Sequence, residues 1–273
     1  MTPTDPAPLD PAGAVTPAAG PAGPPSAAAP ALRRVLAQTG FETRAILRNG
    51  EQLLVTVALP VFLLVGLVAT DVLELDTGGA SRVDFVTPGV LALACLATSF
   101  TSQAIATAFD RRNGVLRLMA TTPLGRGGLL AGKVLGVLGV QVVQVAIIAV
   151  VAAALGWRPD LAGVPAAIGC LLLGTAAFTA LALLLAGTLR AEGVLAVANL
   201  VLVLLVVAGG TLVAPDQLAP WHAHVAVFLP SGALAEAMRG ALLGTGVPPL
   251  SVVVLAAWTA AFGWGAGRLF RWS

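Results

Sequence analysis

Long apolar runs without any Asp, Glu, Lys or Arg are the feature that most limits what this chain can fold into. An α-helix rises about 1.5 Å per residue, so roughly 20 apolar residues cross the hydrocarbon core of a bilayer. Six runs approach or exceed that length, at residues 53–70, 85–109, 134–156, 164–189, 194–213 and 248–267. The sequence therefore predicts an all-α membrane protein with six transmembrane helices.

Composition excludes a soluble globular fold. Hydrophobic residues make up 58% of the chain and charged residues only 10%, whereas soluble domains carry about 25% charged residues. The net charge of +2 is too small to indicate nucleic-acid binding. Residues 1–30 are rich in Pro, Ala and Gly, lack the features of a secretory signal, and are predicted to form a disordered cytoplasmic tail. Residues 31–273 then form the membrane domain.

Basic residues set the predicted orientation, because Lys and Arg collect in the cytoplasmic loops of membrane proteins. With the N-terminus inside, six spans place twelve of the fifteen Lys and Arg residues in the cytoplasm and three outside. The inner set is Arg33, Arg34, Arg44, Arg48, Arg111, Arg112, Arg117, Arg126, Lys133, Arg190, Arg268 and Arg271, and the outer set is Arg82, Arg158 and Arg239. We therefore expect a multi-pass protein with both termini in the cytoplasm.

Two segments outside the six runs have patterns of their own. Residues 31–52 mix four arginines with apolar residues, which is typical of a helix in the membrane interface, and Gly40 is expected to break that helix into two pieces. Residues 214–247 alternate prolines and polar residues with apolar pieces too short to cross a bilayer. Irregular backbone at membrane depth needs protein or water around it, so this stretch is predicted to be a re-entrant or interfacial hairpin.

Few polar side chains lie inside the predicted spans. Proton- and ion-coupled transporters keep acidic or basic groups there as relays, but these runs contain only amides and hydroxyls. The amide residues, which are candidates for lining a substrate path, are Gln103, Gln141, Gln144 and Asn199. A self-sufficient secondary transporter is therefore disfavoured, and the energy source is expected outside this chain. Gln141 and Gln144 share a helix face, which we expect to point toward protein.

Residues 110–133, between the second and third runs, hold five of the fifteen basic residues. The stretch ends in Gly127-x-x-x-x-Gly132-Lys133, which matches part of a phosphate-binding loop. The next residue is Val134 rather than the Ser or Thr that would hold Mg²⁺, and an apolar run follows instead of an α/β domain. The sequence therefore predicts no nucleotide or other cofactor site in this chain. The glycines are expected to permit a tight turn and close helix packing.

The two histidines, His222 and His224, lie two positions apart, a spacing that shares one face of a strand but not of a helix. Two imidazoles without a third ligand form a poor zinc site, so no metal site is predicted. No Ser, His and Asp constellation supports nucleophilic catalysis, so we expect the chain not to be an enzyme. An alternative hypothesis uses the outer histidine loop in a membrane-embedded enzyme or a lipid-modifying protein.

Two ordered motifs resemble the permeases of type-2 ATP-binding-cassette (ABC) exporters, a family that includes bacterial exporters of antibiotics, polysaccharides and lipids. The first motif is similar to the family's cytoplasmic segment between spans two and three. It comprises Arg111-Arg112-x-Gly114-x-Leu116, Thr121-Thr122-Pro123-Leu124-x-Arg126 and Gly132-Lys133. The second is similar to the outer segment before the last span. It comprises Pro215-Asp216-Gln217-Leu218-Ala219-Pro220-Trp221, Leu229-Pro230 and Glu236-Ala237-Met238-Arg239-Gly240.

The resemblance implies a permease subunit that pairs with a second copy or a paralogue and binds a separate cytoplasmic ATPase, which would use ATP and Mg²⁺. It places a coupling helix, which rests against the ATPase, in the first motif. The residues implied in coupling are Arg111, Arg112, Gly114, Leu116, Arg117, Thr122, Pro123, Arg126 and Lys133. Such an exporter moves a hydrophobic or amphipathic drug, antibiotic, lipid or polysaccharide-like molecule across a bacterial plasma membrane, and can confer antibiotic resistance. The substrate, and the choice between homodimer and heterodimer, stay open.

Overall fold

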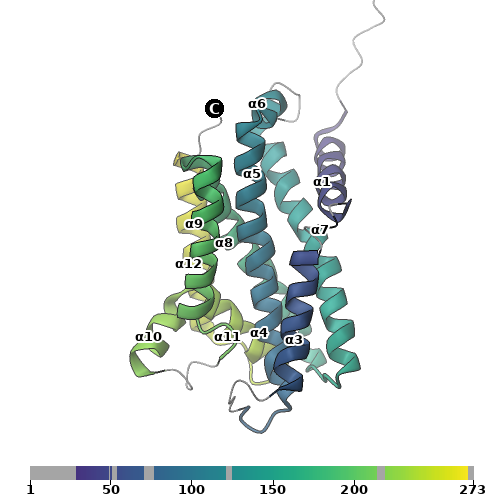
Figure 1. Cartoon of the computed structure of the whole chain (residues 1–273), viewed down its shortest axis with the longest axis vertical. Coiled ribbons are helices and arrows are strands. Elements are labelled where there is room, and N and C mark those ends of the chain that lie inside the picture. The colour runs from purple at the N-terminus through teal and green to yellow at the C-terminus, as the bar shows by residue number, and fades with distance from the viewer. Residues whose placement is uncertain are drawn as a thin grey trace, which may run out of the picture.

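The computed structural model describes residues 29–48, 50, 54–70, 77–120, 125–213 and 219–269. Within these ranges the chain forms α-helices with short π- and 3-10-helical segments and no β-strand, and the helices make one elongated bundle (Figure 1). The all-α prediction is therefore confirmed. The predicted N-terminal tail lies outside the described residues except for its last two positions.

Five helices are long and apolar enough to cross a bilayer. One of them runs without interruption from Arg82 to Arg112, and most of it is buried inside the protein. It comprises α4 (Arg82–Leu96), the π-helical segment η3 (Ala97–Ser102) and α5 (Gln103–Arg112). The other four are α7 (Gly125–Ala154), α8 (Val164–Thr188), which follows the 3-10 turn η4 (Leu161–Gly163), α9 (Ala191–Ala208) and α12 (Pro249–Leu269).

The remaining predicted span is shorter among the described residues. An apolar helix, Thr56–Ala69, begins within the π-helical segment η2 (Leu54–Ala58), continues as α3 (Leu59–Ala69) and packs against α4. A sixth crossing is counted when α10 (Pro220–Phe228) and α11 (Pro230–Leu242) are taken together as one span. The described part of the chain therefore holds five long apolar helices, or six candidate spans when the bent pair is counted as one, instead of six unbroken helices.

The bent pair α10 and α11 lies where a hairpin was predicted, at the end of the bundle opposite α6 (Val115–Ala120) (Figure 1). The two helices meet at 90°. Leu229 precedes Pro230 and adopts an extended backbone, as residues before proline do, which ends α10 and starts α11 in a new direction. Helix α11 is buried along almost its whole length against α4, α8 and α12. The predicted hairpin is thus a broken helix in which protein encloses α11, while α10 is largely exposed.

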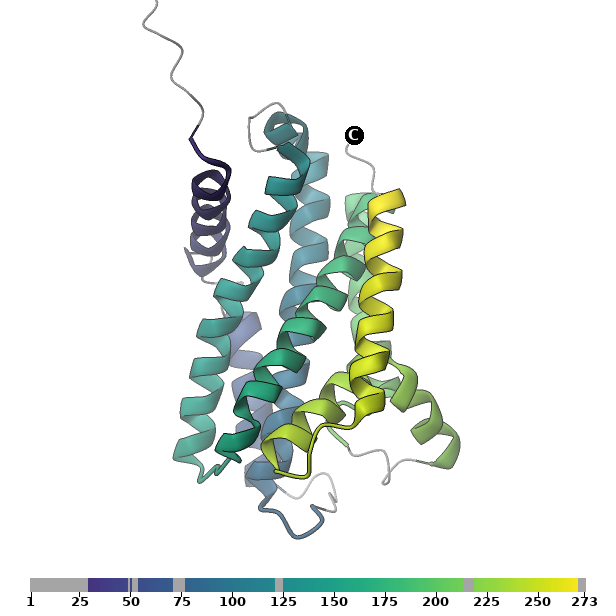
Figure 2. The same cartoon turned by 180° about the vertical axis from the view of Figure 1, so that it is seen from behind.

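The N-terminal helix α1 (Ala31–Arg48) continues through Gly40, so the predicted break there is wrong. Glycine in a helix interior costs only about 1 kcal/mol relative to alanine, and packing of α1 along α7 offsets that cost (Figures 1 and 2). A stripe of glycines on α7 permits this close packing. A Cβ atom on Gly132 would lie 2.5 Å from Cγ of Gln38, and one on Gly136 would lie 2.8 Å from Cβ of Glu42.

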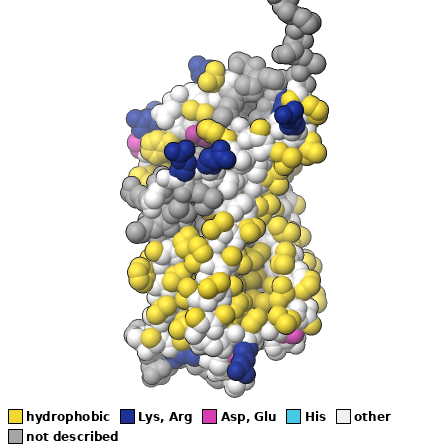
Figure 3. Space-filling model, turned by 90° about the vertical axis from the view of Figure 1, so that its right-hand side faces the viewer, with side chains coloured by type: hydrophobic (Ala, Val, Ile, Leu, Met, Phe, Trp, Pro, Cys, Tyr) yellow, Lys and Arg dark blue, Asp and Glu magenta, His cyan; other side chains and the backbone are white. Residues whose placement is uncertain are grey.

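The surface of the bundle divides into zones. On the face seen in Figure 3, apolar side chains fill a broad band across the middle, while Lys and Arg side chains gather toward the two ends. Such a band between charged ends is what a bilayer requires, because charged groups are costly in its hydrocarbon core. The structure therefore agrees with a protein that spans a membrane with the α6 end on one side and the α10 end on the other.

Candidate functional site

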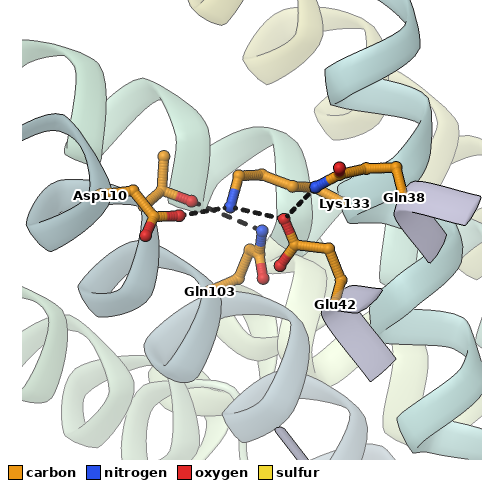
Figure 4. Close-up of polar contacts among 6 residues, drawn as sticks. Gln38, Glu42, Gln103, Asp110 and Lys133 are labelled. Atoms are coloured by element: carbon orange, nitrogen blue, oxygen red, sulfur yellow. Dashed lines mark hydrogen bonds and ion pairs between the residues drawn. The ribbon is translucent and has the colours of Figure 1, made fainter. Parts of the chain in front are cut away.

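A buried ion cluster joins three helices near the α6 end of the bundle (Figure 4). Lys133 on α7 has a side chain only 2% exposed, and its Nζ lies 2.7 Å from Oδ2 of Asp110 on α5 and 3.3 Å from Oε1 of Glu42 on α1. Gln38 donates from Nε2 to the same Glu42 oxygen at 2.9 Å. A buried cation is tolerated when opposite charges surround it. We call these four residues the Lys133 cluster.

The Lys133 cluster was not visible in the sequence as a unit. The resemblance implied a role for Lys133 in coupling to an ATPase, and the structure places its side chain inside the protein, where it holds α1, α5 and α7 together. Gln103, a predicted path residue, lies beside the cluster (Figure 4) and is 4% exposed. Its Nε2 donates to Oγ1 of Thr107 at 3.4 Å. Polar side chains from α5 and α7 therefore lie together inside the bundle, near the α6 end.

Arg111 and Arg112, at the end of α5, contact the corner between α8 and α9. Arg111 donates to the backbone carbonyl oxygen of Leu189. Arg112 forms an ion pair of 2.6 Å with Glu192, in which both side chains are more than half exposed, so its net contribution to stability is small. The guanidinium of Arg112 also lies 5.7 Å above the ring of Phe109. These two arginines connect the end of α5 to the first turn of α9.

The short helix α6 follows directly and lies at the tip of the bundle (Figure 1). Gly114 precedes it with φ +75°, a conformation that glycine adopts without strain, so the chain turns sharply between α5 and α6. Leu116 is buried, whereas Arg117 is exposed and Leu118 is 70% exposed. Helix α6 therefore presents a basic and an apolar side chain outward.

Three predicted coupling residues have no described side chain. Thr122 and Pro123 lie outside the described residues, and Arg126 is described only as backbone in the first turn of α7.

Two of the amides predicted to line a path are engaged inside the chain. Gln141 and Gln144 on α7 are both buried, which confirms that they face protein. Oε1 of Gln141 accepts a hydrogen bond of 2.6 Å from Thr175 on α8. Gln144 accepts one of 3.0 Å from Thr98 in η3 and donates to the backbone carbonyl of Thr56 in η2. Gln144 thus bridges two π-helical segments, which sequence periodicity did not reveal.

Asn199 is placed differently, on an exposed face of α9. Its Nδ2 donates to the carbonyl oxygen of Leu195 in the preceding turn at 2.8 Å. The structure therefore brings Gln103, Gln141 and Gln144 into the interior and leaves Asn199 on the outside of the bundle.

The histidine pair lies on a helix, α10, within the predicted hairpin. Nε2 of His222 is 3.0 Å from the carbonyl oxygens of both Val207 and Ala208, at the end of α9. Nδ1 of His224 is 2.6 Å from the carbonyl oxygen of Pro220. No group of three His, Cys, Asp or Glu residues able to hold a metal occurs in the described ranges. The His222 ring therefore contacts the end of α9, and the His224 ring contacts the first turn of α10.

Arg239 on α11 is a second buried cation, which the sequence analysis placed on the outer side of the membrane within the predicted hairpin. It is 5% exposed and forms an ion pair with Glu236. Its Nη2 donates to the carbonyl oxygen of Thr211 at 2.7 Å, just beyond α9, and its guanidinium lies 5.4 Å from the centre of the Phe85 ring. Cations are favourable at a helix C-terminus, where carbonyl groups lack helical partners. Arg239 thus secures the end of α9 to α11 and α4.

A bundle of apolar helices, with its charges at the two ends and a short basic helix at one tip, defines a multi-pass integral membrane protein. A family model, described as ABC-2 type transporter, matches residues 34–243 of the chain. The chain therefore belongs to the ABC-2 type transporter family, as the two motifs indicated. The family forms the membrane component of ABC transporters, and its members normally work with an ATP-binding subunit. Comparison with curated proteins gives no match.

Proposed function

We propose that this chain is the membrane subunit of an ABC exporter and moves a hydrophobic or amphipathic molecule outward when a separate ATPase subunit binds at α6. The α6 end then faces the cytoplasm, with both termini. The observation that carries this proposal is the arrangement around α6. An exposed helix with Arg117 and Leu118 stands between two attachments to the rest of the bundle.

The first attachment lies before α6, where Arg111 and Arg112 bind the α8–α9 corner. The second lies after it, where Lys133 binds α1 and α5. A ligand shifts a conformational equilibrium only through contacts that differ between the two states. An ATPase that displaces α6 changes the contacts at both attachments. In this division of roles Arg117 and Leu118 touch the ATPase, while Arg111, Arg112 and Lys133 transmit the displacement.

The substrate path belongs to another state of the same bundle. Gln103, Gln141 and Gln144 are buried in this state, so they line a path only after α5, α7 and α8 separate. π-Helical turns are often found at functional sites within longer helices, and Gln144 connects two of them. An apolar path with a few amides suits hydrophobic or amphipathic drugs, antibiotics or lipids. Such a path opens when the attachments around α6 move.

The test is co-purification of the full chain with the ABC ATPases of its host, beginning with any encoded in a neighbouring reading frame. Arg117→Glu is expected to lower the affinity for the ATPase about tenfold or more, because like or unpaired charges at an interface cost several kcal/mol. Arg33→Glu, at an exposed position on α1, makes the same charge change away from α6 and is expected to bind normally. Failure of every host ATPase to bind, or equal binding by both variants, would refute the proposed role of α6.

A further inference from the structure

The outer face of α1, turned away from α7, carries basic and apolar side chains together. Gln38 and Glu42 pack on the glycines of α7, so the residues on the other side of the helix point away from the bundle. Arg44 and Arg48 on that side are exposed, and Phe41 is 62% exposed. A groove of about 550 Å³ runs over this face. The groove is lined by Leu36, Ala37, Gly40, Phe41, Arg44 and Arg48.

Gly40 provides the open space in this groove. Leu36, Gly40 and Arg44 follow one another at intervals of four residues, so they form one row along the helix. A Cβ atom on Gly40 would have nothing within 4 Å, so the missing side chain leaves a gap between its two neighbours in the row. Side chains on a helix lean toward its N-terminus. Arg44 therefore leans toward the gap, and Arg48 leans toward Arg44 from the next turn.

The groove lies beside a membrane span and not in the water beyond it, because α1 stands alongside α7 (Figures 1 and 2). A Cβ atom on Gly139 of α7 would lie 2.8 Å from Oγ1 of Thr43. Gly139 is about two turns inside the candidate span Ala131–Ala154. Arg44 directly follows Thr43, and Arg48 lies one turn further along α1. Both arginines therefore lie at the depth of lipid headgroups and upper acyl chains, where a charged group is costly unless an opposite charge pairs with it.

The chain itself offers these two cations no such pairing. In the described ranges neither Arg44 nor Arg48 forms a hydrogen bond or an ion pair, and the carboxylate of Glu42 lies on the opposite face, bound to Lys133. A soluble partner does not reach into the bilayer to supply the anion, but a lipid phosphate is present at that depth. Guanidinium groups bind phosphates through paired hydrogen bonds. Basic pockets beside membrane helices are also known to bind acidic lipid headgroups.

We propose that the groove on the outer face of α1 binds an anionic phospholipid from the leaflet at the α6 end. The phosphate occupies the gap at Gly40, in contact with the guanidinium groups of Arg44 and Arg48, and the acyl chains extend past Arg48 into the bilayer. Because α1 carries Glu42 of the Lys133 cluster, the bound lipid also stabilises α1 in its docked position on α7. This inference goes beyond the proposed function, because α1 binds the lipid whatever molecule is transported.

The experiment is native mass spectrometry of the purified full chain, titrated in detergent with phosphatidylglycerol or with phosphatidylcholine. The unchanged chain is expected to bind the anionic phosphatidylglycerol more tightly. Arg44→Gln combined with Arg48→Gln is expected to weaken phosphatidylglycerol binding about 25-fold, a factor of about five for each arginine. Arg33→Gln combined with Arg117→Gln is the matched control. It removes two exposed cations from the same end of the bundle and is expected to bind as the unchanged chain does.

The gap is tested without any change of charge. Gly40→Leu fills it at a position where a Cβ has nothing within 4 Å, so the variant is expected to fold normally and to lose the bound lipid. Unchanged binding by Gly40→Leu, equal affinity of the unchanged chain for the two lipids, or equal losses in the two double variants overturns the inference. Displacement of phosphatidylglycerol by an equal concentration of inorganic phosphate also overturns it, because the groove then binds free phosphate.

Binding of the host ATPase is followed with the same variants. If the Arg44 and Arg48 double variant loses the ATPase but keeps phosphatidylglycerol, this face belongs to the ATPase, and the lipid site is refuted while the proposed function stands. Selective phosphatidylglycerol binding without binding of any host ATPase supports the lipid site and refutes the proposed function alone.

Discussion

Replacing Lys133 by methionine keeps a long, flexible side chain in place while removing its charge. Removal of one partner from a buried ion pair costs about 3–5 kcal/mol. Lys133 is 2% exposed, but Glu42 and Asp110 keep 17% and 33% of their side-chain surfaces exposed, so water can partly solvate the carboxylates left behind. We therefore expect a loss of about 2–3 kcal/mol in the free energy of unfolding. Unfolding of the purified full chain in mixed micelles, titrated with SDS, measures it.

Two further variants make this prediction specific to the cluster. Arg33→Met removes an exposed cation from α1 and is expected to change the free energy of unfolding by less than about 0.5 kcal/mol. Glu42→Gln combined with Lys133→Met is expected to cost less than the sum of the single changes, by about 0.5–3 kcal/mol, because the two side chains interact. A loss below about 0.5 kcal/mol for Lys133→Met, or strict additivity of the pair, would contradict a cluster that joins α1, α5 and α7.

Two other predictions concern packing and helix ends. Gly136→Ala is expected to destabilise the chain by about 1–3 kcal/mol, because the added Cβ would lie 2.8 Å from Cβ of Glu42. Gly40→Ala is the control: a Cβ there has nothing within 4 Å, so this variant is expected to be neutral or stabilising by up to about 1 kcal/mol. The same SDS titration compares them, and a larger loss for Gly40→Ala would contradict the packing of α1 on α7. Arg239→Met is expected to lower the free energy of unfolding by about 3 kcal/mol or more, because it leaves Glu236 and the carbonyl groups beyond α9 without their buried donor. Limited proteolysis of the α9–α11 region tests this role, and unchanged protease resistance would contradict it.

The spans were predictable because a bilayer imposes one simple requirement on composition. The charge-free run 164–189 became α8 (Val164–Thr188), and the run 248–267 became α12 (Pro249–Leu269), so the boundaries agree within two residues. The hairpin was predictable for a related reason, since proline and polar residues interrupt its apolar pieces. The ordered motifs indicated the transporter family, whereas hydrophobic periodicity alone does not distinguish one family of membrane proteins from another.

Tertiary contacts account for what the sequence did not reveal. Gly40 was expected to break a helix, but α1 gains enough from its contact with α7 to stay continuous. Lys133 closes a basic segment that the sequence placed in the cytoplasm, and its partner Asp110 lies 23 positions away, so only the fold brings their charges together. The sequence placed His222 and His224 in a hairpin without partners, and α10 brings both rings against backbone carbonyls. The π-helical segments η2 and η3 leave no periodic signal in sequences this short.

The docking of α1 on α7 sets an order for assembly during synthesis. Thr43 on α1 donates to the carbonyl oxygen of Gly136, which lies 93 positions later in the chain. Glu42 likewise lacks its cation until Lys133 has been made. Helix α1 therefore cannot complete these contacts until α7 has been synthesised. Truncated chains that end before α7 should consequently expose α1 to protease, although every residue of α1 is present.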